Sequence, residues 1–371
     1  MKRQLLGVAA ILLSISTYAQ DNPLWMRYCA ISPDGTTIAF TYKGDIYTVP
    51  STGGRASQIT TNPAHDTKPI WSPDGKKIAF ASDRMGSMDI FEVNKEGGIP
   101  KRLTTHSGNE TPVAYKDAGH ILFLANIMPT AEDAQFPSGQ FQQVYEVNTE
   151  GGRPILFSSM PMEDISINHT GNTLLYHDKK GYEDPWRKHH TSSITRDIWL
   201  CSLNGNRTFR KQTAFNGEDR TPVWASDDKS FYYLSEEKGS FNIFKRDIDG
   251  NTSKQITNHT KHPVRFLSAA SNGTLCYGYD GEIYTVKEGA IPQKVQISIV
   301  TDKNDKDLIR QIKRSGATEI SLSPDAKEIA FVLRGDVYVT STEYSTTKQI
   351  TNTPQQERDI HFSPDGRSIV Y

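Results

Sequence analysis

Short segments in which apolar and polar residues alternate recur along the whole chain. A representative pair is IAFAS at 78–82 followed by DIFEV at 89–93. Alternation with a period of two residues is typical of half-buried β-strands, whereas an amphipathic helix has a period of about 3.6 residues. Pro and Asp-Gly pairs stand between these segments and favour tight turns. The pattern therefore predicts an all-β fold of short strands.

The predicted strands belong to a sequence repeat. The strongest copies begin at Ser32, Ser72, Ser323 and Ser363, and the spacing within each of these two successive pairs is 40 residues. These copies read ISPDGTTIAFTY (31–42), WSPDGKKIAFASDR (71–84), LSPDAKEIAFVL (322–333) and FSPDGRSIVY (362–371), with weaker copies at 115–125, 167–177, 224–235 and 270–279.

Each unit contains four strand segments. The first ends at the SPDG turn, the second resembles IAFAS, the third has an Asp/Asn-Ile-aromatic core, and the last is short and ends in Thr, as in GGRASQIT. Four strands in about 40–50 residues are the signature of a β-propeller blade. We predict a six-bladed β-propeller of four-stranded blades over 26–300. Each blade is read as contiguous sequence with no strand left over, so the ring is expected to close by packing alone.

The sequence repeat is interrupted at 301–316, TDKNDKDLIRQIKRSG, which we interpret as a charged linker. The repeats restart at 317–371, where we predict the truncated start of a second β-propeller. One continuous seven-bladed ring is the alternative. Residues 1–19 combine Lys2 and Arg3 with a short apolar stretch and predict a signal peptide cut after Ala19. The mature protein is then expected to be periplasmic or secreted, and an uncleaved membrane anchor is the alternative.

The charge composition limits the classes of molecule that the protein is expected to bind. The 42 Lys and Arg residues balance 43 Asp and Glu residues, so no global charge favours nucleic acid or an anionic membrane. Cys29, Cys201 and Cys276 lie in apolar strand-like segments without metal-binding spacing, and we interpret them as buried thiols. An exported protein could also form one disulfide among them, which the sequence does not specify.

No catalytic, metal-binding or cofactor-binding constellation is evident in the sequence. It lacks G-x-S-x-G, H-E-x-x-H, Walker and Rossmann patterns. The Asp of each SPDG is expected to accept hydrogen bonds within its own turn. We therefore predict no catalytic residue, no metal and no cofactor in this chain.

Insertions at 126–143 and 178–196 separate strands of the third and fourth units. Propeller insertions map to loops on one face and often carry binding. The second insertion supplies our candidate binding residues, Trp186, Arg187, Lys188 and Arg196. Arg pairs well with a carboxylate and Trp offers stacking, so the loop is expected to capture an anionic group such as a peptide carboxylate. A solvated basic loop, or a contact with a neighbouring domain, is the alternative.

The WSPDGKKIAFASDR unit, with its D-I-aromatic and KQIT strands, resembles the propeller repeat shared by TolB and the tricorn proteases. Six such units, a charged linker and a restart at GATEISLSPDAKEIAF resemble the N-terminal part of tricorn-like serine peptidases over 26–371. In that family a six-bladed propeller precedes a seven-bladed one, a PDZ-like domain and catalytic domains. The family's catalytic Ser, His and Glu lie in the C-terminal domains, and no position of this chain corresponds to them.

The resemblance implies a non-catalytic module that gates or guides peptides for a serine peptidase active site elsewhere in the same polypeptide. Its implied partners are peptides and the downstream peptidase domains, with a homo-oligomer left open. The alternative is a TolB-like periplasmic propeller that binds proteins and has no peptidase activity. An independent enzyme acting in a propeller channel has no supporting motif.

Overall fold

A computed structural model describes residues 23–127, 141–182, 184, 186, 191–300, 313–344 and 346–371. Every regular element in these ranges is a β-strand. The described residues accordingly contain no helix long and apolar enough to cross a membrane. The all-β prediction is confirmed.

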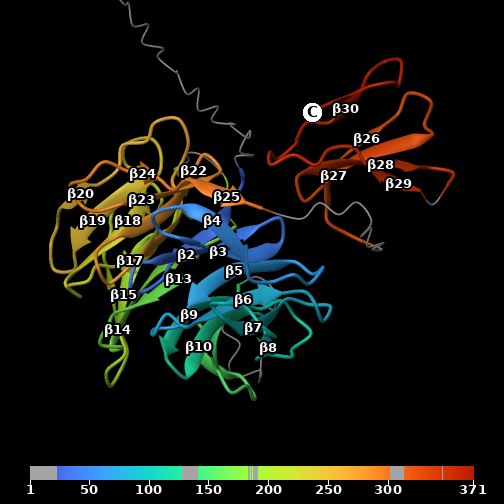
Figure 1. Ribbon diagram of the computed structural model, residues 1–371. Coiled ribbons are helices and arrows are strands. Elements are labelled where there is room, and N and C mark those ends of the chain that lie inside the picture. Colours follow the sequence, from blue (N-terminus) through green and yellow to red (C-terminus); the bar gives the residue numbers. More distant parts are fainter. Residues whose placement is uncertain are drawn as a thin grey trace, which may run out of the picture.

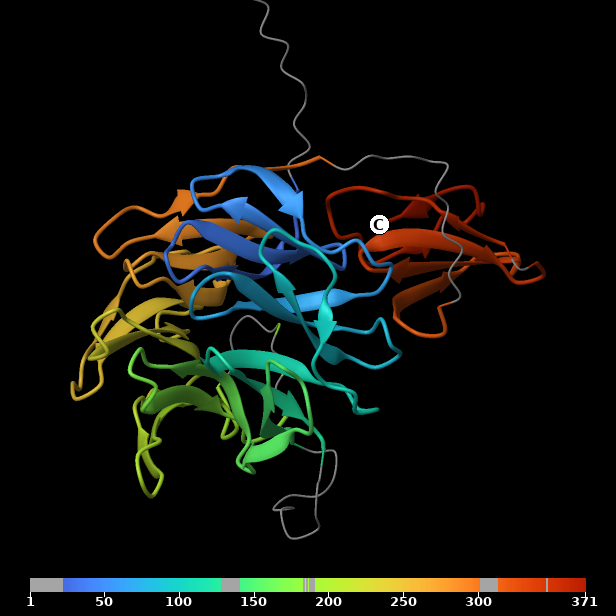
Figure 2. The same cartoon turned by 60° about the horizontal axis from the view of Figure 1, so that its bottom comes forward.

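Six sheets, each of four consecutive antiparallel strands, are arranged in a ring in Figures 1 and 2. The first three sheets comprise β1 (Arg27–Ile31), β2 (Thr37–Tyr42), β3 (Asp45–Pro50) and β4 (Gly54–Gln58); β5 (Asp66–Trp71), β6 (Lys77–Ser82), β7 (Asp89–Asn94) and β8 (Lys101–Arg102); β9 (Thr111–Asp117), β10 (His120–Ala125), β11 (Gln143–Asn148) and β12 (Ile155–Ser158).

The fourth to sixth sheets follow the same plan around the ring. They comprise β13 (Met162–Ile167), β14 (Thr173–Asp178), β15 (Ile198–Ser202) and β16 (Thr208–Lys211); β17 (Asp219–Trp224), β18 (Ser230–Ser235), β19 (Asn242–Asp247) and β20 (Ser253–Gln255); β21 (Arg265–Ala269), β22 (Leu275–Tyr279), β23 (Glu282–Val286) and β24 (Gln293–Lys294).

The first strand of each sheet faces the centre of the ring. β1 contacts β5, β5 contacts β9, and the series continues through β13 and β17 to β21, which contacts β1 again. This closed circle of inner strands is the arrangement of a β-propeller and is compatible with the predicted six blades.

The hydrophobic core is divided among the interfaces between neighbouring sheets. In one such cluster Ala39 and Ile46 of the first sheet pack with Trp71 and Phe80 of the second. The Trp71 indole also donates from Nε1 to the Ala30 carbonyl oxygen, 2.8 Å away on the preceding inner strand. Each sheet therefore buries its apolar faces against its neighbours, as a repeat architecture requires.

The repeated sequence motifs have local structural roles. Ser72 Oγ donates to Asp74 Oδ1 at 2.7 Å, and the Lys76 amide donates to the same oxygen at 3.1 Å, so the SPDG Asp serves its own turn as predicted. Where a Thr follows the fourth strand of a unit, its hydroxyl accepts from the amide near the start of the third strand. For example, the Ile90 amide donates to Thr104 Oγ1 at 2.9 Å.

Ring closure differs from the sequence prediction. Only Gln293–Lys294 joins the sixth sheet, and a further strand, β25 (Ile297–Ile299), pairs in parallel with β4 at the outer edge of the first sheet. The expectation of closure by packing alone is therefore wrong. Ile297 is buried in the cluster shared by the first and sixth sheets, and three residues are too short a segment for its strand partner to be recognised from periodicity.

A separate group of strands follows β25. It comprises a four-stranded sheet of β26 (Ala317–Leu322), β27 (Glu328–Leu333), β28 (Asp336–Ser341) and β29 (Thr347–Gln349), and a pair of β30 (His361–Phe362) with β31 (Ile369–Val370). Figure 2 places this group beside the first two sheets. Lys43 Nζ donates across to Asn352 Oδ1 at 3.2 Å.

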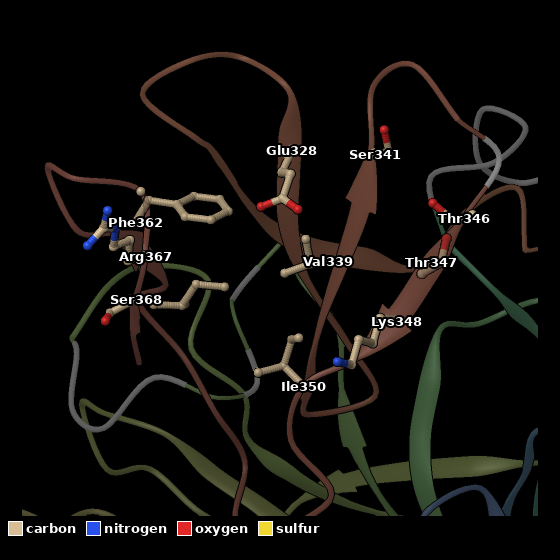
Figure 3. Close-up of a pocket in the computed structure, with 12 residues that line it drawn as sticks. Glu328, Val339, Ser341, Thr346, Thr347, Lys348, Ile350, Phe362, Arg367 and Ser368 are labelled. Atoms are coloured by element: carbon tan, nitrogen blue, oxygen red, sulfur yellow. The ribbon is translucent and has the colours of Figure 1, made fainter.

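A hollow of about 560 Å³ lies between the four-stranded sheet and the β30–β31 pair. Figure 3 shows Val339, Ile350 and Phe362 around it, with the charged Glu328 and Lys348 on separate strands. Val339 and Phe362 belong to the small apolar cluster that joins the two elements. We therefore interpret the hollow as a packing gap between neighbouring blade elements.

Candidate functional site in the central channel

The centre of the ring contains a cavity of about 610 Å³. Residues from all six inner strands line it, together with Tyr182 and Trp186 of the insertion between β14 and β15. Because these strands surround a common axis, side chains from opposite ends of the propeller sequence, such as Tyr28 and Phe266, face the same space. We take this channel as the candidate functional site.

A β-bulge in five inner strands aims side chains into the channel. The pairing of β1, β5, β13, β17 and β21 with their second strands skips residues at the same position of each unit. One residue of each bulge has a left-handed backbone, with φ between 47° and 57°, and lines the cavity: Tyr28, Lys68, Asp164, Thr221 and Phe266.

A left-handed backbone costs a residue with a side chain about 1–2 kcal/mol. Strained conformations that recur at one position are associated with functional sites, and bulges commonly re-aim a side chain. In β9 the equivalent cavity-lining residue is Pro112, whose ring fixes a negative φ and forbids the left-handed conformation. The strand β9 also shifts register at this position, so the bulge recurs there, but the ring of left-handed residues has five members and omits the third sheet.

Glu163 is the centre of an ionic network on one side of the channel. Lys179 Nζ lies 2.7 Å from its carboxylate, His177 Nε2 lies 3.2 Å away, and Arg196 Nε lies 3.5 Å away. Burial alone raises the pKa of Glu163, but His177 and Lys179 outweigh it and hold the pKa well below its ordinary value. The Thr221 amide donates to His177 Nδ1 at 3.2 Å, which leaves Nε2 to donate to Glu163.

Two arginines share a second, fully buried carboxylate behind the channel wall. Arg196 Nη1 lies 2.8 Å from Glu218, and Arg220 Nη1 lies 3.5 Å from it. The Arg220 guanidinium also lies 4.1 Å from the centre of the Phe241 ring. Both cations therefore have fixed positions in the wall.

Trp186 reaches across the channel mouth to the first and sixth sheets. Its ring is in cation–π contact with two guanidinium groups, with Arg27 Cζ 5.1 Å and Arg265 Cζ 4.9 Å from the ring centre. Arg265 Nη2 donates to the Trp186 carbonyl oxygen at 2.7 Å, and Phe266 meets the indole edge-on at 6.1 Å. Such cation–π contacts contribute about 0.5–2 kcal/mol each.

The structure places some of the predicted binding residues at the channel and leaves others undescribed. Trp186 and Arg196 both line the channel. However, Arg196 is buried against Glu163 and Glu218, so its charge is already balanced by carboxylates of the protein. Arg187 and Lys188 lie outside the described residues. Among the residues that the structure does describe, no group of three His, Cys, Asp or Glu side chains could hold a metal ion.

Sequence reasoning placed the site in the insertion and missed the bulge ring. A signal was present in the first strand of every unit of the ring except the third, where charged or bulky residues precede the apolar run at the same position. Examples are Arg27-Tyr28 before CAI, Arg220-Thr221 before PVW and Arg265-Phe266 before LSA. Charged side chains repeated in the innermost strand of a propeller indicate a polar channel wall.

Comparisons with known proteins agree with this architecture. A family model described as the tricorn protease N-terminal beta propeller domain matches residues 23–290. Tricorn protease homolog 1 of Streptomyces coelicolor is 24% identical over 94% of this chain and 32% of its own length. The tricorn protease homolog of Saccharolobus solfataricus is 27% identical over 76% of this chain and 26% of its own length.

Among solved structures, the crystal structure of the tricorn protease is similar with a TM-score of 0.62 and 19% identity. The similarity covers 92% of this chain and 33% of that one. The chain therefore spans about a third or less of the length of these relatives.

Proposed function

Since the chain belongs to the tricorn protease N-terminal β-propeller family, we propose that it is a non-catalytic channel module that guides and restricts the passage of peptides. The serine peptidase domains it serves lie further along the same polypeptide. The observation that carries this proposal is the channel itself, a cavity of about 610 Å³ lined from all six sheets. This chain spans 32% or less of the length of these relatives, so the rest of each relative is long enough to contain separate peptidase domains.

The channel wall suits a peptide that passes without being cleaved. Tyr28, Phe266 and Trp186 offer aromatic surface, and the surrounding charged side chains offer hydrogen bonds to a peptide backbone. Selection in such a channel is steric and electrostatic. A folded protein is too large to enter, whereas an extended segment of a few residues fits.

Peptide binding by the mature chain tests this proposal. Fluorescence anisotropy of short, labelled, unstructured peptides is expected to show saturable binding without hydrolysis, and Trp186→Ala is expected to weaken it several-fold. Tyr344→Ala, an exposed aromatic residue of the second group of strands, is the matched control. Lack of any peptide binding by the wild-type chain contradicts the proposal. Binding of a folded protein partner instead would favour a TolB-like interaction propeller.

Export and the larger parent protein belong to the same proposal. The predicted signal peptide at 1–19 gives a mature protein that begins at Gln20 in the periplasmic or secreted fraction. Intact mass and N-terminal sequencing of the native product measure this directly. A cytoplasmic product that retains Met1 contradicts export. A native product whose mass shows that its last residue is Tyr371 contradicts the attached peptidase domains.

A further inference from the structure

Lys68 differs from the other cations of the channel. It occupies the left-handed position of the β5 bulge, with φ of 53°, and lines the cavity. Its Nζ lies 5.8 Å from the centre of the Tyr28 ring. Within the described parts of the chain, no carboxylate lies within ion-pair distance of this amine.

The carboxylates of the channel are already engaged by other groups. Glu163 is shared by Lys179 and Arg196, at 2.7 and 3.5 Å. Asp164 accepts a hydrogen bond from the Thr221 hydroxyl at 2.7 Å. The cavity lining contains five cationic side chains against two carboxylates: Lys68, Lys179, Arg196, Arg220 and Arg265 against Glu163 and Asp164. Even with the buried Glu218 behind the wall and Asp184 near Arg265, cationic side chains outnumber carboxylates among the residues that the structure describes here.

An enclosed cation without a counter-charge is unfavourable, and an anion entering the cavity would relieve that cost. The pKa of Lys68 reflects this cost, because burial lowers it. Asp164 and Glu163 attract the Lys68 ammonium, and they would also repel a doubly charged group such as a phosphate. The local balance therefore favours a single carboxylate.

The surroundings of Lys68 add an apolar contact surface. Tyr28, whose ring lies beside the amine, contacts the Phe266 ring of the sixth sheet with the ring centres 4.8 Å apart. A carboxylate bound at Lys68 would thus have aromatic surface next to it for the aliphatic part of the same residue.

We propose that Lys68 binds a carboxylate of a peptide in the channel, so that the channel favours acidic peptides over neutral ones. This inference rests on the proposed function, because it assumes that peptides enter the cavity. The carboxylate could belong to an Asp or Glu side chain or to the peptide C-terminus. Both sources offer the same chemistry to the lysine ammonium.

Binding of a matched peptide set to the mature chain tests the inference. One peptide contains Glu residues, a second has Gln in their place, and each is prepared with a free and an amidated C-terminus. The reference peptide has Gln in place of Glu and an amidated C-terminus, so it carries no carboxylate. The wild type is expected to bind either the Glu peptide or the peptide with a free C-terminus at least tenfold more tightly than this reference. Lys68→Gln is expected to abolish this preference, because it should weaken binding of the acidic peptide far more than binding of the neutral peptide. Lys68→Arg keeps the charge and should retain most of the preference.

Controls separate this inference from the proposed function. Lys261→Gln, an exposed lysine away from the channel, should behave as wild type, and thermal melting checks that each variant folds. Glutarate serves as a second probe because it carries carboxylates without a peptide backbone. Equal binding of acidic and neutral peptides overturns the inference and leaves the proposed function standing. An acidic preference that survives Lys68→Gln also overturns it. Glutarate binding that Lys68→Gln abolishes, without binding of any peptide, assigns a carboxylate site to Lys68 but overturns the peptide as its ligand, and with it the proposed function. Absence of both overturns both.

Discussion

Glu110 is a buried carboxyl group at the junction of the second and third sheets, and it makes the stability of the ring depend on pH. Its side chain is fully buried, and within the described residues neither carboxyl oxygen makes a hydrogen bond. Burial raises the pKa of Glu110 to about 7. The nearby Thr104 hydroxyl lowers the pKa, and the Asp89 carboxylate raises it further. Glu110 is therefore protonated in the folded protein under mildly acidic conditions.

The direction of the pH effect follows from comparing the folded and unfolded states. The ordinary pKa of the Glu carboxyl is 4.5, so between about pH 4.5 and 7 the folded protein holds a proton that the unfolded chain has released. The free energy of unfolding then falls as pH rises through this window. A difference of about 2.5 in pKa corresponds to about 3 kcal/mol in total at about 1.36 kcal/mol per pKa unit.

Glu110→Gln removes the titration and keeps the shape of the side chain. Relative to wild type, this variant is expected to gain about 2–3 kcal/mol in free energy of unfolding between pH 5 and pH 8. Urea denaturation at both pH values, followed by tryptophan fluorescence, measures the difference. Glu96→Gln changes an exposed carboxylate with a side chain that is 73% accessible, and should give a pH-independent difference. A Glu110→Gln effect that is equal at pH 5 and pH 8 would refute the assignment of a raised pKa.

Three further predictions concern the ring and its repeated contacts. Ile297→Ala removes the buried anchor of β25 and should lower the free energy of unfolding by about 2–4 kcal/mol in urea denaturation, whereas Ile291→Ala at a 79% exposed site should change it by less than about 0.5 kcal/mol; equal effects would contradict the role of β25. Thr104→Val leaves the Ile90 amide without its acceptor and should cost about 1–3 kcal/mol by the same assay, whereas Thr104→Ser should retain most of the stability; similar losses in both variants would assign the effect to packing. A bulky maleimide, followed by mass spectrometry, should leave the native protein unlabelled at its three buried cysteines and modify them only after denaturation and reduction: Cys29, Cys201 and Cys276.

The sequence was sufficient for the strands because their signals are local. Alternation at 78–82 and 89–93 and the SPDG turns predict β6, β7 and the turns between strands, and the structure contains them at those positions. The regular period of the repeat predicts the blades for the same reason. These features depend on neighbours in the chain, so one unit read in isolation already specifies them.

Features that depend on distant residues were not predictable in the same way. The partner of β25 is β4, which belongs to the first unit of the ring, and so short a strand carries no periodicity to specify it. The channel combines inner strands from the whole ring, so the contact of Tyr28 with Phe266 follows only from the closed circle. Trp186 was predicted as a binding residue from its loop, but its contact with both Arg27 and Arg265 also requires the closed ring.

Contacts between sheets explain a repeated feature that a single blade leaves unexplained, the Asp that opens many third strands. This Asp interacts electrostatically with a carboxyl group at the start of the next unit. The four pairs are Asp45 with Asp66, Asp89 with Glu110, Asp197 with Asp219, and Asp336 with Glu357. Burial raises the pKa of one member of each pair, and the carboxyl group of its partner raises that pKa further: Asp45, Glu110, Asp219 and Asp336.

Two buried carboxyl groups that raise each other's pKa favour a state in which one of them keeps its proton. The D-I-aromatic motif therefore acts at the junction with the next sheet, in addition to forming its own strand. Where Asn242 replaces the Asp, its side chain instead accepts from the Thr257 hydroxyl at 3.0 Å and the His259 amide at 2.7 Å, so that junction has no acid pair. The acid pair recurs at Asp336 and Glu357, after the ring has closed. The unit that the sequence repeats is thus a blade together with its contact to the following blade, because a propeller blade is stable only when both of its faces are covered.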